Sequence, residues 1–177
     1  LVIHNEGKNF SVGANIGVML FSANIAAWPQ LQAGIKGGQD VYMSLRLGKF
    51  PVVSAPSGIA VGGGCEILMH SDAVQAHAET YTGLVEVGVG VMPGWGGCKE
   101  MVRRHLANTR SARGPTPALV KAFELIGTAQ VAKSAMEAQR DFLIINEKDT
   151  ITFNKERVLF DAKQRALGLL DGYEPPE

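Results

Sequence analysis

Short apolar runs alternate with segments of helical periodicity along this chain. Three apolar runs predict buried strands, at residues 1–3, 51–55 and 72–78. Residues 29–47 predict a helix, because apolar side chains such as Val41 and Leu45 recur four positions apart. Strands that alternate with helices predict an α/β fold with mainly parallel pairing.

The remaining segments are rich in glycine, proline and polar residues. Residues 6–15 predict a turn, residues 80–86 a loop or short strand, and residues 107–117 a surface loop. A glycine turn at residues 57–66 is expected to open onto a helix that includes Cys65. Four further helices are predicted, at residues 98–105, 118–126, 130–143 and 154–170.

The composition fits one globular domain. The chain has 177 residues, 46% of them hydrophobic, and a formal net charge of zero. This length can bury a substantial core. A neutral chain lacks the basic excess typical of nucleic-acid binding, and no apolar run is long enough to span a membrane. We therefore expect neither nucleic acid nor a membrane span.

Cysteine and histidine usage does not indicate a metal site. Cys65 and Cys98 stand far apart, without the spacing of a zinc site or a disulfide framework. The four histidines show no spacing that suggests a metal ion or a catalytic triad. The sequence therefore predicts no metal, and a reducing compartment.

The two ends of the chain predict a piece of a longer protein. The chain begins at Leu1 inside an apolar run, and it ends in a proline-containing segment at residues 172–177. Paired prolines do not continue a helix and are typical of a linker. We expect further sequence on both sides.

The glycine-rich stretch at residues 57–66 is the strongest sign of chemistry. Unpaired amides at a helix N-terminus favour negative charge. Glu66 follows the glycines, and Glu86 stands twenty residues further on. Each glutamate alone equally fits an ordinary strand or helix surface. Both have apolar neighbours, where an unpaired carboxylate is costly, so together with the glycine turns they predict a general acid–base pair.

A second backbone segment is expected to complete this site. If residues 10–15 fold over the glycine stretch, the backbone amides of Ala14 and Gly63 point at one oxygen atom. Two converging N–H donors form an oxyanion hole, and each donor stabilises an enolate-like transition state by about 3 kcal/mol. Taken alone, residues 10–15 fit a plain turn beside a strand.

Four features in this order resemble the signature segments of the enoyl-CoA hydratase/isomerase (crotonase) family. They are NFSVGANI at residues 9–16, IAVGGGCEI at residues 59–67, Glu86, and MPGWGG at residues 92–97. The resemblance implies an α/β, crotonase-like spiral of ββα units with C-terminal helices. It implies a crotonase core at residues 1–143 without the family's N-terminal hairpin and first helix. Residues 144–177 would form a C-terminal helical segment and the start of a linker.

The resemblance also implies roles for individual residues. The thioester oxygen of an acyl-CoA would lie between the amides of Ala14 and Gly63, with Glu66 as the water-activating base and Glu86 as the proton donor. The other substrate-binding positions that it implies are Val12, Asn15, Ile16, Gly62, Val85 and Gly94. Both glutamates together favour hydration of a trans-2-enoyl-CoA to the 3-hydroxyacyl-CoA in fatty-acid β-oxidation.

The same resemblance implies partners and a location. Hydration would need no cofactor, since coenzyme A is part of the substrate. NAD would belong only to a fused 3-hydroxyacyl-CoA dehydrogenase outside this chain, as in the multifunctional members. A trimer-based homo-oligomer is expected. The location would be the cytoplasm of a bacterium, or the mitochondrial matrix or peroxisome of a eukaryote.

Other functions stay open at this point. A Δ3-Δ2 enoyl-CoA isomerase would use the same fold, and a non-catalytic module for oligomerisation or RNA binding would need neither glutamate. Two residues depart from the family pattern: Asn15 stands where the family often has Asp, and Trp95 is bulkier than the small residue common at its position. The bulk of Trp95 implies a short or reshaped acyl pocket.

Overall fold

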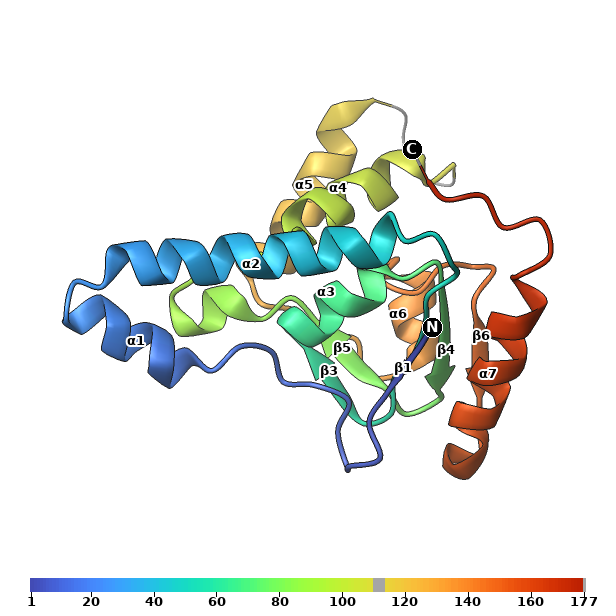
Figure 1. The fold of residues 1–177 in the computed structure, drawn as a ribbon. Coiled ribbons are helices and arrows are strands. Elements are labelled where there is room, and N and C mark those ends of the chain that lie inside the picture. Colours follow the sequence, from blue (N-terminus) through green and yellow to red (C-terminus); the bar gives the residue numbers. More distant parts are fainter. Residues whose placement is uncertain (110–113, 177) are drawn as a thin grey trace.

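The structure is a computed structural model of the chain, and it describes residues 1–109 and 114–176. Short strands alternate with helices (Figure 1), which confirms the α/β class. The elements are β1 Val2–His4, α1 Ile16–Asn24, α2 Trp28–Arg46, β2 Val53–Ala55, β3 Ile59–Val61, α3 Gly63–His70, β4 Ala73–His77, β5 Tyr81–Gly83, the 3₁₀ helix η1 Glu86–Val89, α4 Gly97–Ala107, α5 Pro115–Gly127, α6 Ala135–Arg140, β6 Thr150–Thr152, the 3₁₀ helix η2 Lys155–Arg157 and α7 Val158–Gly168.

Two β-sheets form the centre of the fold, and the strands within each sheet are parallel, as the alternation of strands and helices predicted. The larger sheet has the strand order β1-β2-β4-β6, and Val53 of β2 pairs with Val2 on one side and Ala73 on the other. The smaller sheet pairs β3 with β5, with Val61 opposite Gly83. This small sheet delivers the chain directly to the glycine stretch.

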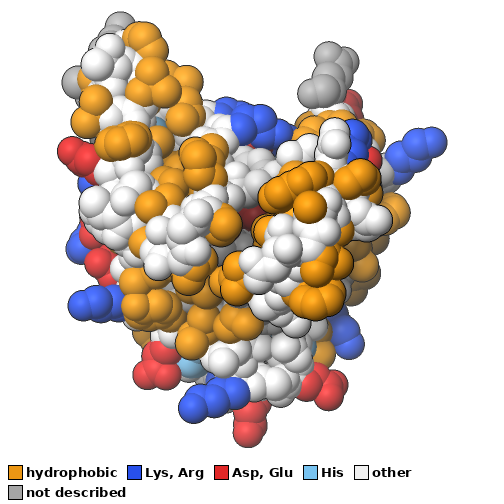
Figure 2. Space-filling view, turned by 90° about the vertical axis from the view of Figure 1, so that its left-hand side faces the viewer, with side chains coloured by type: hydrophobic (Ala, Val, Ile, Leu, Met, Phe, Trp, Pro, Cys, Tyr) orange, Lys and Arg blue, Asp and Glu red, His pale blue; other side chains and the backbone are white. Residues whose placement is uncertain are grey.

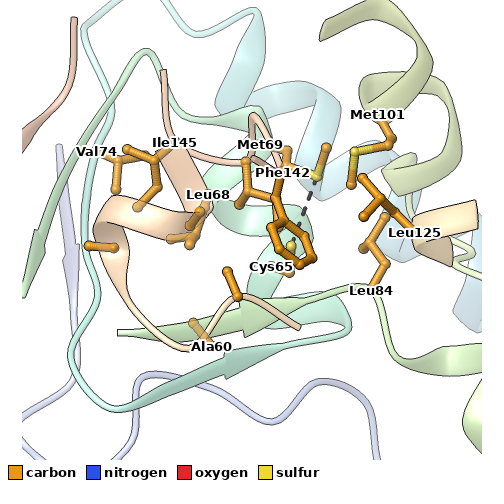
Figure 3. Packing of buried hydrophobic residues seen from close by; sticks show 14 of the residues in the cluster. Ala60, Cys65, Leu68, Met69, Val74, Leu84, Met101, Leu125, Phe142 and Ile145 are labelled. Atoms are coloured by element: carbon orange, nitrogen blue, oxygen red, sulfur yellow. Dashed lines mark hydrogen bonds between the residues drawn. The ribbon is translucent and has the colours of Figure 1, made fainter. Parts of the chain in front are cut away.

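Alternate residues of the larger sheet face two different apolar clusters. Ala73 and Val53 pack against Val158 of α7, which lies along one side of the sheet (Figure 1). Val74, the next residue of β4, joins the main core, where Leu68 of α3 also lies (Figure 3). Each large side chain buried in this way stabilises the fold by about 1.5–3 kcal/mol. Helix α3 is therefore fixed at its base by the core.

Helix α1 was not predicted from the sequence. Its apolar residues occur around much of the helix, so the sequence shows no amphipathic period. None of its residues is buried. Asn15 begins the helix, because its side-chain Oδ1 accepts a hydrogen bond from the amide of Val18 at 3.2 Å. Helices α1 and α2 form a hairpin that extends away from the sheets (Figure 1).

The C-terminal third differs from the prediction at several points. The helix expected at residues 130–143 is limited to α6, because Ala132 exchanges two backbone hydrogen bonds with Thr82 in an antiparallel bridge. Strand β6 was not predicted, and the helix expected at residues 154–170 begins with the separate turn η2. The expected loop at residues 107–117 ends early, since α5 begins at Pro115, and residues 110–113 lie outside the described part. No described helix is long and apolar enough to cross a membrane.

Candidate active site

The site begins where β3 meets α3. The predicted glycine turn contains a strand, β3, which sequence reasoning missed. Gly62 then caps α3 with a φ of 57°, a left-handed conformation that favours glycine. A Cβ atom on Gly64 would lie 2.5 Å from the carbonyl oxygen of Ser11. Glycine at this position therefore lets a second backbone segment lie against the start of the helix.

That second segment runs alongside β3. The amide of Ser11 donates to the carbonyl of Ile59 at 3.1 Å, and the amide of Val61 donates to the carbonyl of Ser11 at 3.0 Å. Gly13 then approaches so closely that a Cβ atom on it would lie 3.0 Å from the backbone nitrogen of Gly63. Ala14 follows directly in sequence. Convergence of the Ala14 and Gly63 amides on one oxygen stays a prediction, and this close approach supports it.

Glu66 lies one turn inside α3 and is buried, with 1% of its surface exposed. Its Oε1 accepts two backbone hydrogen bonds, from Trp95 at 2.9 Å and from Gly97 at 2.8 Å. Burial raises the pKa of this carboxyl group, and the two hydrogen bonds act in the opposite direction. Glu66 is thus a buried carboxylate with one oxygen held in a fixed position.

Glu86 begins η1 and faces the same helix start. Its Oε1 would lie 3.4 Å from a Cβ atom placed on Gly62. Its Oε2 is buried and has no hydrogen-bond partner among the described residues, which is uncommon for a buried oxygen. Burial raises the pKa of Glu86 to about 7, and the charge of Glu66 adds to the shift. The two glutamates therefore interact electrostatically beside the N-terminus of α3.

Two aromatic residues complete the site: Tyr42, which sequence reasoning did not assign to it, and Trp95, which it connected only with the acyl pocket. The hydroxyl of Tyr42, the single buried residue that the structure gives for α2, donates to the carbonyl of Gly63 at 2.9 Å. The Trp95 ring meets the Tyr42 ring edge-on, with 5.2 Å between centroids. The Trp95 and Gly97 amides that bind Glu66 were also missed. The crowding of glycines at residues 94–97 was the available signal, since it marks close backbone approach.

The other predicted substrate-binding positions lie around this centre with different roles. Asn15 caps α1, and the carbonyl of Gly94 accepts a hydrogen bond from Gln39 of α2 at 2.8 Å. Val12 and Ile16 are exposed, and Val85 directly precedes η1. Contact of any of these residues with a substrate stays a prediction.

The α1–α2 end of the molecule has an apolar face with a hollow in it. Figure 2 shows apolar side chains gathered around the hollow and an acidic side chain at its base. Exposed apolar residues of α1, its turn into α2, and the segment after Glu86 are Leu20, Phe21, Ile25, Trp28, Val89 and Met92. An acidic side chain on this face is therefore surrounded by apolar side chains.

A separate cavity lies at the opposite end of β3. Its volume is about 420 Å³, and its lining includes Ser57, His77, Glu79 and Tyr81 but neither glutamate of the pair. In the described ranges, no group of three or more His, Cys, Asp or Glu side chains is placed to hold a metal ion. Glu79 thus offers a control position away from the proposed chemistry.

The packing of Trp95 on α2 predicts opposite effects for two neighbouring glycines. Gly37→Ala should stabilise the protein by up to about 1 kcal/mol, because open space surrounds Gly37 and alanine favours a helix. Gly38→Ala should destabilise it by about 1–3 kcal/mol, because the new Cβ would overlap the Trp95 indole. Denaturant unfolding measures both changes. Equal stability of the two variants would contradict this packing.

A sequence model of one protein family matches more than half of this chain. The model described as Enoyl-CoA hydratase/isomerase matches residues 1–113, which include both glutamates and the glycine stretch. The chain belongs to the enoyl-CoA hydratase/isomerase family. Membership confirms the resemblance seen in the sequence, and the site described above is that of a family member.

Members of the family that resemble this chain include much longer proteins. The chain is 42% identical over 177 residues to a protein named probable 3-hydroxyacyl-CoA dehydrogenase from Bacillus subtilis, covering 99% of this chain and 22% of that protein. It is 32% identical over 162 residues to a putative fatty acid oxidation complex trifunctional enzyme from Rickettsia felis, covering 92% and 21%. The chain therefore spans about a fifth of the length of these relatives.

A solved structure of the family has the same fold. The crystal structure of an enoyl-CoA hydratase from Polaromonas sp. JS666 superimposes with a TM-score of 0.75 at 25% identity, covering 95% of this chain and 58% of that one. The predicted crotonase-like α/β fold is thereby confirmed.

Proposed function

We propose that this site hydrates a 2-enoyl-CoA to the 3-hydroxyacyl-CoA. The observation that carries the proposal is the meeting of two glutamates in unlike environments at the start of α3. Glu66 is held by two amides, whereas Glu86 has a buried oxygen without a partner among the described residues. Environments that separate two carboxyl groups in this way suit a base and an acid. The family membership supports an acyl-CoA as substrate.

Activation of the substrate is assigned to backbone amides. The thioester oxygen would accept hydrogen bonds from Ala14 and Gly63 at the N-terminus of α3, where the helix dipole favours negative charge. Polarisation of the thioester withdraws electrons from the double bond and makes C3 electrophilic. The close approach of Gly13 to Gly63 supports this placement of the two amides.

Glu66 is assigned the role of the base. The two amides fix Oε1, and no hydrogen bond to Oε2 occurs among the described residues. The second oxygen is therefore the one that would take a proton from water as the water oxygen bonds to C3. The backbone hydrogen bonds favour the charged form of Glu66, which a base needs before the reaction.

Glu86 is assigned the role of the acid. With its pKa raised to about 7, it holds its proton over much of the neutral range and can donate it to C2. One water proton goes to Glu66, the remaining hydroxyl bonds to C3, and the Glu86 proton goes to C2. The sum is the addition of one water molecule, and proton exchange with solvent restores both glutamates.

The direct test is hydration of crotonyl-CoA by the intact protein, followed as loss of the absorbance of the conjugated thioester. Turnover would support the proposal, and its absence would contradict it. A Δ3-Δ2 isomerase is the second candidate, because the raised pKa lets Glu86 alone carry a proton between C2 and C4. Conversion of a 3-enoyl-CoA to the 2-enoyl-CoA measures that activity separately.

The rate of hydration should depend on pH in both directions. Glu86 must be protonated, so kcat/KM should fall as pH rises above about 7. Glu66 must be charged, so kcat/KM should also fall as pH drops through its pKa, which burial raises. The two groups titrate as a coupled pair. A pH profile on crotonyl-CoA measures both limbs, and a rate that is unchanged across pH 7 would contradict the assignment of Glu86.

Cofactors, assembly and location follow from the same proposal. Hydration would use no cofactor, and NAD would belong to a dehydrogenase portion outside this chain, in keeping with the names of the longer relatives. The exposed apolar residues of α1, such as Leu20 and Phe21, support burial between copies in a homo-oligomer. A trimer and a cytoplasmic location in a bacterial source are our expectations.

A further inference from the structure

The Trp95 side chain lies directly against the start of α3. A Cβ atom placed on Gly63 would lie 2.8 Å from Cζ3 of the indole and 3.0 Å from Cε3. The backbone of the same residue donates to Glu66 at 2.9 Å. One residue thus touches both the helix start proposed to bind the thioester oxygen and the proposed base.

Helix α2 holds the indole from the other side. A Cβ atom on Gly38 would overlap Nε1 of Trp95, so the ring lies on bare backbone there. The Tyr42 ring packs edge-on against it, and Gln39 holds the preceding carbonyl of Gly94 at 2.8 Å. Contacts on both sides leave the indole little freedom to move aside. It is a fixed, half-buried wall between α2 and α3.

We propose that Trp95 determines the length of the acyl chain and restricts the site to short 2-enoyl thioesters of crotonyl size. The inference rests on the proposed function, in which the thioester oxygen binds the Gly63 amide. The acyl carbons then extend past Gly63, where the indole occupies the space beside its Cα. Gly38 and Tyr42 act as positioning residues for the indole.

The effect of removing this wall is measurable because apolar pockets discriminate by methylene groups. One methylene group that fits or fails to fit changes specificity by about 10-fold or more. In Trp95→Ala, the space of the indole becomes available to a longer chain. A rigid aromatic wall should therefore give way to a pocket that favours longer thioesters.

Binding of two unreactive saturated thioesters, butyryl-CoA and decanoyl-CoA, tests the inference in the intact protein by calorimetry. The wild type should bind butyryl-CoA at least as tightly as decanoyl-CoA. Trp95→Ala should shift the ratio of the two dissociation constants by about 10-fold or more toward decanoyl-CoA. A ratio within twofold of the wild type would overturn the inference.

Two variants control for general damage to the protein. Phe153→Ala removes an aromatic side chain that is 78% exposed directly after β6, outside the segments that form the site, and should leave the ratio unchanged. Gly38→Ala should change the ratio by displacing the indole, and should have no such effect when combined with Trp95→Ala. An effect of Gly38→Ala that persists in the double variant would also overturn the inference.

The outcome separates this inference from the proposed function. Crotonyl-CoA turnover reports on hydration, whereas the saturated thioesters report on the pocket alone. Turnover with an unchanged binding ratio would reject Trp95 as the wall and keep the hydratase. A shifted ratio without turnover would keep the wall and reject the hydratase. Failure of both thioesters to bind would overturn the acyl pocket, and Trp95 as its wall.

Discussion

Glu66→Gln and Glu86→Gln should each lower kcat for crotonyl-CoA by about 10²–10⁴-fold. Glutamine keeps the size of the side chain but neither takes a proton from water nor gives one to C2. In Glu66→Gln the amide oxygen can still accept the hydrogen bonds from Trp95 and Gly97, so the fold should persist. Steady-state kinetics, with circular dichroism of each variant, measures the loss.

Glu79→Gln is the matched control for these two substitutions. Glu79 is exposed and lines the separate cavity at the opposite end of β3, so its replacement should leave kcat unchanged. Near-normal turnover in both Glu66→Gln and Glu86→Gln would refute the acid–base pair. Loss of hydration with retained Δ3-Δ2 isomerisation in Glu66→Gln would favour the isomerase, because a single glutamate would then be sufficient.

Arg104→Met should lower the free energy of unfolding by about 3–5 kcal/mol. Arg104 is buried in α4, and its guanidinium donates hydrogen bonds to several acceptors at 3.0–3.1 Å. The acceptors are the carbonyls of Met69, Leu143 and Ile144 and the side chain of Asn146. Methionine fills similar space but leaves these acceptors without a donor, which is the main cost. Urea unfolding measures the change.

The control for this substitution is Arg140→Met. Arg140 is exposed and pairs with its neighbour Asp141 at the surface, where an ion pair contributes little. Its replacement should leave the urea midpoint unchanged. Equal midpoints for Arg104→Met and the wild type would show that the C-terminal segment does not depend on this guanidinium.

The features that sequence reasoning predicted depend on local patterns. The strands β1, β2 and β4 are apolar runs, and α2 has four-residue spacing, so each could be placed from its own residues. Glu66 and Glu86 could be predicted as an acid–base pair because each is a charged residue with apolar sequence neighbours close to a glycine turn. The structure brings the two together, since Glu86 lies beside Gly62 at the start of α3 and the charge of Glu66 raises the pKa of Glu86.

The features that were missed depend on contacts between distant segments. Strand β6 exists because β4 supplies its partner, with Ala76 opposite Ile151, and three residues alone give no period. The donors to Glu66 come from Trp95 and Gly97, which no local spacing connects to it. Tyr42 looks like an ordinary helix residue until α2 packs on α3. Such pairings follow from tertiary packing.

The contact between Gly38 and Trp95 has a consequence for how this protein can vary. The Trp95 indole occupies the space that a Cβ atom at position 38 would need, so a large ring at position 95 requires glycine at position 38. A large ring at position 95 therefore keeps α2 weakened by a glycine at its centre, at about 1 kcal/mol of helix propensity. Exchange of the ring for a small residue would remove this overlap and allow alanine at position 38. Under the role proposed for Trp95, a substitution at position 95 would therefore change both the acyl chain length that the site accepts and the helix former that α2 can carry at position 38.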